Sequence, residues 1–319
     1  MKKNLLIFVV AIMALSLIFA VGCSEDGDNN ENGKSKGKWI QKANYPGTAV
    51  TNPIAFSING KIYVGMGGTG YDYKHDFWEY NPTTDKWTQK KSSPSAKEYN
   101  GTMYEYRNLC HFVSNNKGYV IAYNGYDGDC LWEYNALNDT WTEKMKCPVP
   151  PNTACFAVGN YAYVICYERC YKYNIETDEW TRLPDEDYRY RLTKPVLTSD
   201  NNYAYCLSSY IGNTFWIYDP KSNEWAQRAD YPERSYGDIV VPTSIWVHNN
   251  YVYAGMGYSN DIRSIGTVND IYRYDSKTNA WEFATTFPGS QRAGQFSIVC
   301  NGKIYVGLGG FLDFWEYQP

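Results

Sequence analysis

Residues Tyr80–Trp87 read Tyr-Asn-Pro-Thr-Thr-Asp-Lys-Trp, and this step of seven residues from tyrosine to tryptophan recurs along the chain. The other complete copies are Tyr134–Trp141, Tyr173–Trp180, Tyr218–Trp225 and Tyr274–Trp281. The polar residues between the two aromatics predict a tight turn that joins two short strands. Tyr317 has no tryptophan after it, whereas Trp39 stands alone near the start. We therefore expect one repeat to be divided between the two ends of the chain, which would close a ring.

A second tyrosine lies in a short apolar run ahead of each step, as Tyr63 does in Lys-Ile-Tyr-Val-Gly. A turn rich in Asn and Gly, such as Asn59-Gly60, comes before each run and supplies the positive φ that a tight hairpin needs. Each repeat thus predicts four short strands, a to d. Six such units predict an all-β chain, a six-bladed β-propeller of four-stranded antiparallel blades. The strand around Trp39 would complete the C-terminal blade, so that no sheet edge stays open there.

The repeat resembles the kelch-repeat family from about Trp39 to the end. The resemblance rests on the strand-c tyrosine, the strand-d tryptophan, and the pairs Gly67-Gly68 and Gly309-Gly310 after strand b. Blades 2, 3 and 4 depart from the double glycine and have Asn124-Gly125, Tyr167 and Ser208-Ser209. The resemblance implies a kelch-type β-propeller over residues 38–319.

The first 37 residues carry no repeat. Lys2-Lys3 precede an apolar run from Leu5 to Val21, and Gly22 stands directly before Cys23. This pattern resembles a bacterial lipoprotein signal, with residues 1–22 as signal peptide, Cys23 as lipidation site and residues 23–37 as a flexible linker. An uncleaved single-span anchor is the alternative. Either way we expect an exported, tethered propeller, and the lipid would make it an outer-membrane lipoprotein of the cell envelope, periplasmic or surface-exposed. The acidic linker suits a surface-export signal or a plain spacer equally.

The formal net charge is −4 with both signs mixed, so nucleic acid is not an expected partner. The chain has three histidines and no Cys-x-x-Cys, so we expect no metal and no cofactor. Cys166 and Cys170 flank a short connection that would place them opposite each other, which makes them a possible disulfide. Four further cysteines are expected to pack as small buried hydrophobes in strands: Cys110, Cys155, Cys206 and Cys300.

The b–c and d–a loops emerge on one side of the predicted ring and vary in length, which is where binding sites are usually built on a rigid scaffold. Their arginines and tyrosines suit a carbohydrate, particularly an acidic sugar, or an extended peptide. The candidate ligand-binding residues are Tyr71, Arg107, Arg189, Arg234, Tyr236 and Arg292. The kelch resemblance implies that Arg234 and Arg292 point toward the channel mouth. An inter-blade salt bridge is the alternative role for these two.

We expect a binding or interaction module rather than an enzyme, because the sequence contains no Gly-x-Ser-x-Gly, His-Glu-x-x-His or phosphate loop. The alternative is a sugar mutarotase that resembles N-acetylneuraminate epimerase, which would need an acid, a base and a cation for the carboxylate. Candidates for those roles are Glu105, Asp187, Glu233, Arg234 and Arg292. A copper radical oxidase is a third reading that we disfavour, because His111 and His248 lie in different blades and no copper ligand set is assembled.

Overall fold

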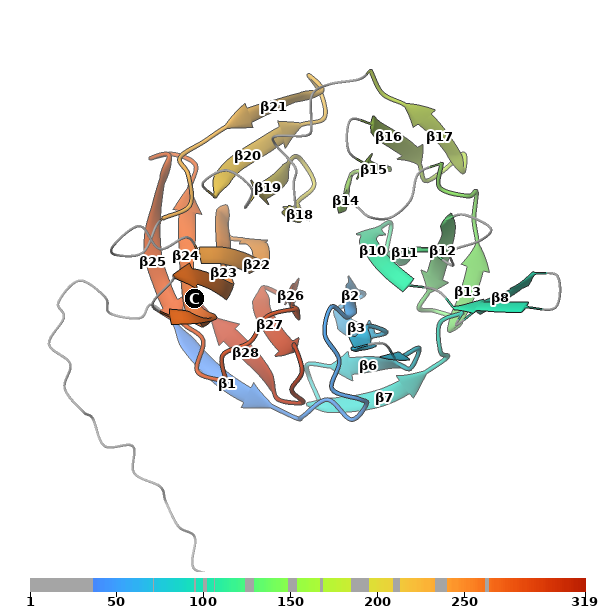
Figure 1. Cartoon of the computed structure of the whole chain (residues 1–319), viewed down its shortest axis with the longest axis horizontal. Coiled ribbons are helices and arrows are strands. Elements are labelled where there is room, and N and C mark those ends of the chain that lie inside the picture. Colours follow the sequence, from blue (N-terminus) through green and yellow to red (C-terminus); the bar gives the residue numbers. More distant parts are fainter. Residues whose placement is uncertain are drawn as a thin grey trace, which may run out of the picture. The chain divides into compact units, whose positions relative to one another are not determined.

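The computed structural model describes residues 37–70, 72–94, 96–99, 102–105, 107–123, 129–148, 154–166, 169–184, 195–208, 213–232, 240–261 and 264–319. These residues form six four-stranded antiparallel sheets arranged as a ring, with two additional two-stranded hairpins (Figure 1). The six-bladed all-β propeller expected from the repeat is confirmed. No helix among these residues is long and apolar enough to cross a membrane.

Each blade runs from an inner strand a to an outer strand d. Blades 1 to 3 are β2 (Ile54–Ile58), β3 (Lys61–Gly65), β6 (Phe77–Asn81), β7 (Lys86–Lys90); β10 (Arg107–Ser114), β11 (Lys117–Tyr123), β12 (Asp129–Asn135), β13 (Thr140–Glu143); and β14 (Ala154–Val158), β15 (Tyr161–Cys166), β16 (Arg169–Asn174), β17 (Glu179–Arg182). Blades 4 and 5 are β18 (Val196–Ser199), β19 (Ala204–Ser208), β20 (Thr214–Asp219), β21 (Glu224–Gln227); and β22 (Val240–His248), β23 (Tyr251–Asp261), β24 (Ser264–Asp275), β25 (Ala280–Thr286). Blade 6 is β26 (Gln295–Cys300), β27 (Lys303–Leu308), β28 (Phe314–Gln318) and β1 (Lys38–Lys42). The two small hairpins are β4 (Gly68–Thr69) with β5 (Asp72–Tyr73), and β8 (Ala96–Tyr99) with β9 (Thr102–Glu105).

The ring is closed by strand β1, which comes from the start of the chain and pairs antiparallel with β28 near its end. Trp39 lies opposite Tyr317 in this register, just as Trp87 lies opposite Tyr80 within blade 1. The Trp39 and Tyr317 rings stack with their centroids 4.7 Å apart. The repeat divided between the chain ends is therefore rebuilt in space, as its sequence predicts.

The contacts at the boundary between blades 2 and 3 show why the tyrosine-to-tryptophan step recurs. The Tyr173 hydroxyl donates to Asp178 (2.6 Å), which also accepts the Met145 N–H from the segment that follows strand d of blade 2 (3.0 Å). The Trp180 indole N–H donates to the Met145 carbonyl (3.2 Å). Asp178 and Trp180 thus hold both backbone polar groups of one residue of the preceding blade, and Tyr173 holds Asp178 in place. We call this three-residue arrangement the blade clamp.

The blade clamp recurs at three other boundaries with the same spacing. Its members are Tyr80, Asp85 and Trp87 on Ala43; Tyr134, Asp139 and Trp141 on Lys91; and Tyr274, Asn279 and Trp281 on Ala229. The central Asp or Asn adopts a positive φ in every copy, for example 60° at Asp178 and 53° at Asn279. Asp and Asn tolerate this conformation better than other non-glycine residues and also supply the acceptor oxygen. The positive φ and the need for an acceptor oxygen together explain why Asp or Asn occupies this position.

Two boundaries depart from the pattern. In blade 4 the Tyr218 hydroxyl donates to Asn223 (2.7 Å), but the residue four positions after Trp180 is Pro184, which has no N–H to offer. Between blades 5 and 6 the Trp39 indole donates to the Thr285 hydroxyl instead of a carbonyl (3.1 Å). The seam between blades 3 and 4 is therefore the one where proline replaces the clamped amide.

Two clamp aspartates have pKa values below their ordinary range. Burial by itself raises the pKa of Asp178, but the Tyr173 hydroxyl, the Met145 N–H and Lys144 outweigh it and lower the pKa. At Asp85 burial is likewise outweighed by the Ala43 N–H, the Tyr80 hydroxyl and Lys42. Because these carboxyls take up protons less readily in the folded chain than in the unfolded chain, their contribution to stability holds above the ordinary pKa. It is lost as the pH falls through the lowered value.

Replacing Asp178 with glycine tests the blade clamp without a penalty for positive φ. We expect Asp178→Gly to lower the free energy of unfolding by about 2 kcal/mol, because it leaves one amide and one hydroxyl without their acceptor. The matched control is Asn223→Gly, which faces Pro184 and should cost about 1 kcal/mol less. Urea unfolding followed by tryptophan fluorescence measures both. The gap between wild type and Asp178→Gly should shrink as the pH is lowered below about 4. An equal loss of unfolding free energy in Asp178→Gly and Asn223→Gly would contradict the stabilising role of the blade clamp.

Candidate functional site

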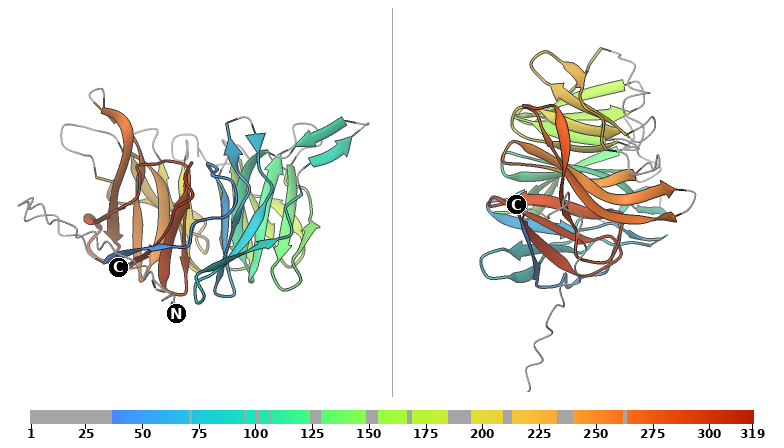
Figure 2. Two further views of the ribbon diagram at one scale, coloured as in Figure 1. Left: turned by 90° about the horizontal axis from the view of Figure 1, so that it is seen from below. Right: turned by 90° about the vertical axis from the view of Figure 1, so that its left-hand side faces the viewer.

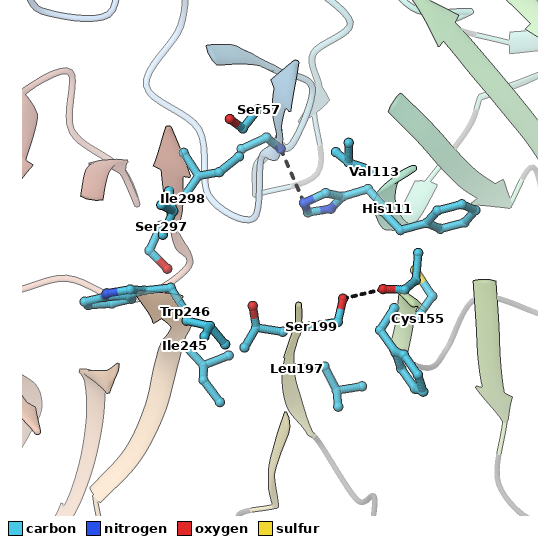
Figure 3. A pocket seen from close by; sticks show the side chains of 17 residues that line it. Ser57, His111, Val113, Cys155, Leu197, Ser199, Ile245, Trp246, Ser297 and Ile298 are labelled. Carbon is cyan, nitrogen blue, oxygen red and sulfur yellow. Dashed lines mark hydrogen bonds between the residues drawn. The ribbon is translucent and has the colours of Figure 1, made fainter. Parts of the chain in front are cut away.

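A central channel runs where the six innermost strands meet, and a cavity of about 280 Å³ occupies it (Figure 3). Each blade contributes residues from its strand a: Ala55 and Ser57 from β2, His111–Val113 from β10, Cys155–Ala157 from β14, Leu197–Ser199 from β18, Ile245–Val247 from β22 and Ser297–Val299 from β26. The lining combines aliphatic side chains with the hydroxyls of several serines and one threonine. A cavity of this size and character suits a small polar molecule or water.

The inner strands expose unpaired backbone N–H and carbonyl groups along the edge that faces this channel. Side chains from neighbouring blades form hydrogen bonds with some of these groups. The Ala55 N–H donates to His111 Nε2 (3.4 Å), and the Ser199 hydroxyl donates to the Ala157 carbonyl (2.6 Å). The Ser114 hydroxyl likewise donates to the Gly159 carbonyl (2.9 Å). An unpaired strand edge is a liability for a sheet, and these contacts protect it blade by blade.

His111 is the titratable group of the channel wall among the residues that line the cavity. Burial lowers the pKa of His111 to about 4, so the imidazole is neutral near pH 7. Because its Nε2 accepts the Ala55 N–H, the ring proton belongs on Nδ1. His111 therefore offers an uncharged hydrogen-bond donor in this wall. His248 lies at the far end of β22, where burial also lowers its pKa.

A disulfide joins Cys110 to Cys155, with an S–S distance of 1.95 Å, and so links strand β10 of blade 2 to strand β14 of blade 3. The expectation that these two cysteines pack as separate buried hydrophobes is wrong. Each lies on an innermost strand, and the ring brings those strands side by side across 45 residues of sequence. Their places on the innermost strands of two successive repeats, two residues before Phe112 and one residue before Phe156, were the available signal. Cys206 and Cys300 are buried as expected.

The backbone register shows that Cys166 and Cys170 are not opposite each other. Cys166 pairs with Arg169, and Cys170 pairs with Ile165. The two cysteines are therefore offset by one residue in the register and do not form a cross-strand pair. The expected juxtaposition is therefore wrong by one residue of register. The Cys166 side chain itself lies outside the described residues.

Arg292, predicted to contact a ligand at the channel mouth, is instead a structural residue. Its side chain has no exposed surface and forms a bidentate pair with Asp313, with both N–O distances 2.7 Å. The guanidinium lies over the Phe287 and Phe311 rings, 4.9 and 4.4 Å from their centroids, and donates to the Leu308 carbonyl (3.0 Å). The partner Asp313 belongs to the b–c connection of the same blade, so the inter-blade alternative is also wrong.

Asp313 shows the electrostatic consequence of this pair. Burial alone would raise the pKa of this carboxyl, but Arg292 and the Trp315 indole N–H outweigh that and lower it. The double glycine nearby has a related structural role, because Gly309 and Gly310 both adopt positive φ and both donate to the Val50 carbonyl (3.1 and 3.0 Å). These contacts join the b–c loop of blade 6 to the segment that leads into blade 1.

The remaining predicted site residues are not placed by the structure. Tyr71, Arg189, Arg234, Tyr236 and Cys23 lie outside the described residues, as do Asp187 and Glu233. Arg107 begins β10 and Glu105 ends β9, but their side chains are not described. These residues stay predictions.

The loop face does have a distinctive shape. Figure 2 (left) shows the β4–β5 hairpin, the β8–β9 hairpin and the extended tip of β23–β24 rising from the same side of the ring. The three come from b–c connections of blades 1 and 5 and from the d–a connection into blade 2. Exposed apolar side chains also lie on b–c segments of blades 5 and 6: Tyr258, Phe311 and Leu312. Within the described residues, no group of three or more His, Cys, Asp or Glu could hold a metal ion.

Comparison with known proteins agrees with this architecture. Residues 55–94 match the Kelch motif family model. Human Kelch-like protein 23 is 24% identical over 80% of the chain, and N-acetylneuraminate epimerase of Shigella flexneri is 30% identical over 110 residues, 34% of the chain and 29% of that protein. The solved structure of YjhT aligns with a TM-score of 0.62 at 12% identity, covering 86% of this chain and 95% of that one. The chain is a six-bladed β-propeller that carries a Kelch motif over residues 55–94. This kelch propeller spans about half the length of the Kelch-like relatives it matches, since the match covers 45% of human Kelch-like protein 23.

Removing the Arg292 guanidinium should lower the stability of the propeller and not only weaken ligand binding. We expect Arg292→Ala to lower the free energy of unfolding by about 3 kcal/mol, because Asp313 would keep a charge without its buried partner. Arg292→Lys should recover only part of this, since lysine cannot form the bidentate pair. Arg228→Gln, at an exposed arginine, is the control and should change stability by less than about 0.5 kcal/mol. Urea denaturation compares the three variants; an Arg292→Ala protein as stable as the control would show that the pair contributes nothing.

The disulfide is testable by peptide mapping. Under non-reducing digestion we expect one fragment that contains both Cys110 and Cys155. Replacing both cysteines with alanine should lower the free energy of unfolding by about 3 kcal/mol, because the bond closes a long loop of chain. Alkylation of both thiols without reductant would contradict the assignment.

Proposed function

We propose that this kelch propeller is a binding module that holds a carbohydrate or a cell-surface partner against the loop face around the channel mouth. One observation supports the proposal most strongly. Three β-hairpins project from the side of the ring on which the b–c and d–a loops lie. Variable elements on a rigid scaffold are where recognition is usually built. An acidic sugar fits the predicted loop residues Arg189 and Arg234, because arginine binds carboxylates through two hydrogen bonds.

A protein partner is the other occupant of the same face. Relatives that match over 80% of the chain are named Kelch-like protein 23. Exposed Tyr258, Phe311 and Leu312 on this side give a protein surface apolar contacts.

A sugar epimerase is a second candidate, and its support is the 30% identity to N-acetylneuraminate epimerase over 110 residues. Epimerisation requires a group that removes a proton and a group that returns one. In the channel wall the described titratable group is His111, which is neutral at pH 7 and whose Nε2 already accepts the Ala55 N–H. An acid–base pair would therefore have to come from the loops, where Glu105, Asp187 and Glu233 are the candidates.

We further propose that the propeller is exported and tethered to the bacterial outer membrane through lipid on Cys23, with residues 24–37 as the spacer. The disulfide between Cys110 and Cys155 supports export, because disulfides persist in oxidising compartments and are rare in the cytosol. The alternative of an uncleaved membrane anchor predicts the same compartment for the propeller.

A glycan array together with sialic-acid titration tests the loop-face proposal. We expect the full chain to bind an acidic sugar and the double variant Arg189→Ala, Arg234→Ala to lose at least about tenfold in affinity. Arg228→Gln, beside the turn residues Ser222 and Asn250 rather than the hairpins of the loop face, should bind like wild type. An anomer-exchange measurement by NMR then separates binder from epimerase. Absence of binding to every glycan would sink both sugar proposals and leave the protein partner.

A further inference from the structure

The base of the blade interfaces, on the side of the a–b and c–d turns, carries an ion-pair network that the repeat builds more than once. Between blades 1 and 2, Glu79 accepts from Lys61 (2.5 Å) and from the Tyr63 hydroxyl (2.9 Å). Lys90 of strand d lies 3.7 Å from Glu79 and 3.8 Å from Asp139 of the next blade. Two cations and two carboxylates thus fill the space beneath the tyrosine.

The same residue types recur at two other boundaries, where a strand-b lysine pairs with the strand-c glutamate and the strand-d lysine pairs with the aspartate of the next blade. The residues are Lys117, Tyr119 and Glu133 with Lys144 and Asp178 between blades 2 and 3, and Lys303, Tyr305 and Glu316 with Lys42 and Asp85 between blades 6 and 1. In each case a strand-c glutamate faces the strand-b tyrosine in the register, as Glu133 faces Tyr119 and Glu316 faces Tyr305. The network therefore follows from position in the repeat.

The interface between blades 4 and 5 keeps one cation of this network and loses both carboxylates. Ile217 faces Tyr205 in the register, in the place of the glutamate, and Ala226 lies opposite Ile217 on strand d. Tyr203 takes the place of the strand-b lysine, and Asn279 that of the aspartate in the next blade. Arg228 stands where blade 1 has Lys90, three residues after the tryptophan.

Arg228 consequently has no carboxylate within ion-pair distance among the residues that the structure describes. Its one hydrogen bond there goes from Nη1 to the carbonyl of its own neighbour, Gln227 (3.3 Å). In blades 3 and 5 the tyrosine at the position of Tyr203 is covered by a cation from strand c: Lys172 lies 4.5 Å from the Tyr161 ring centroid and Arg273 lies 4.5 Å from that of Tyr251. Ile217 cannot do this, and Tyr203 is 41% exposed.

A cavity of about 460 Å³ lies where these groups are missing. Its apolar surface comes from Ile217, Ala226 and Val252, with the rings of Tyr203, Tyr205 and Tyr274 around it and Arg228 on its wall. The carboxyl groups that fill the equivalent space elsewhere are absent, and the cation that would pair with them remains. Volume, apolar lining and one unpaired guanidinium are the attributes of a small-molecule site.

We propose that the cavity between blades 4 and 5 binds a small organic monocarboxylate with an apolar, preferably aromatic, body. The ligand carboxylate would take the place of the missing glutamate and accept from Arg228, while its body would lie on Ile217 and the Tyr203 ring. Asp219 and Glu224, which pair with each other in register at the turn end of the cavity, repel a second negative group. This selects one carboxylate over two. The site is distinct from the loop face and independent of what binds there.

Benzoate is a suitable probe, with benzamide as its uncharged analogue and phthalate as the dianion. Ligand-observed NMR on the full chain should show benzoate binding with a Kd on the order of 1 mM, as expected for so few atoms. Benzamide and phthalate should each bind at least about tenfold more weakly, and added salt should weaken benzoate because Arg228 is exposed.

Two variants act on the cavity in opposite ways. Arg228→Gln removes the cation and should weaken benzoate at least about tenfold without unfolding the chain. Ile217→Glu restores the glutamate of blades 1, 2 and 6, so it should pair with Arg228 and abolish benzoate binding while keeping the melting temperature at or above that of wild type. Lys90→Gln, at the equivalent position of the complete network, is the matched control and should leave binding unchanged.

The loop variant Arg189→Ala, Arg234→Ala should also bind benzoate like wild type, which separates this site from the loop face. Any of three results would overturn the proposal: no benzoate signal up to about 10 mM, equal binding of benzamide, or equal binding by Arg228→Gln. If Ile217→Glu failed to fold, the Arg228→Gln result alone would decide.

Discussion

The blade clamp is the constraint on which the ring depends. A β-sheet of four strands has a polar edge and two apolar faces, and neighbouring blades can slide against each other if only apolar faces meet. The clamp prevents this, because both backbone groups of one residue, such as Met145, are held by Asp178 and Trp180 of the next blade. Directional hydrogen bonds at the periphery thus fix the register between blades, while the buried tyrosines and aliphatic residues supply the packing.

The clamp residues both form the turn between strands c and d and contact the preceding blade. This is why so much of the fold could be predicted from the sequence. The step from Tyr173 to Trp180 is not only a mark of strands c and d; its two aromatics and the Asp at positive φ between them form the contact with the preceding blade. Ring closure was predictable for the same reason, since Trp39 needs a tyrosine partner and Tyr317 needs a tryptophan. A pattern whose residues make the inter-blade contacts reports on tertiary structure directly.

The site was less predictable, and the reasons are physical. Arg292 follows a proline in a loop, where arginine is usually solvated. Asp313, 21 residues further along the chain, and the rings of Phe287 and Phe311 enclose it, and the sequence pattern does not encode these contacts. The disulfide between Cys110 and Cys155 depends on the spacing of adjacent inner strands, which becomes visible only when the ring is built. The predicted pairing of Cys166 with Cys170 was wrong for a smaller reason. The register differs by one residue from the one expected, and a shift of one residue exchanges the two faces of a strand.

A repeat protein also supplies its own controls. Where three blade interfaces fill one space with the same lysines and glutamates, the interface that fills it with Ile217, Ala226 and Tyr203 cannot be explained by what the fold requires. The fold tolerates either arrangement, since strands β20 and β21 pair in the same register as β6 and β7. The loss of both carboxylates leaves Arg228 without an ion-pair partner among the described residues. An anionic ligand would supply that partner next to the apolar surface. The departures from the repeat, rather than the repeat itself, are therefore where this propeller differs chemically from a bare scaffold.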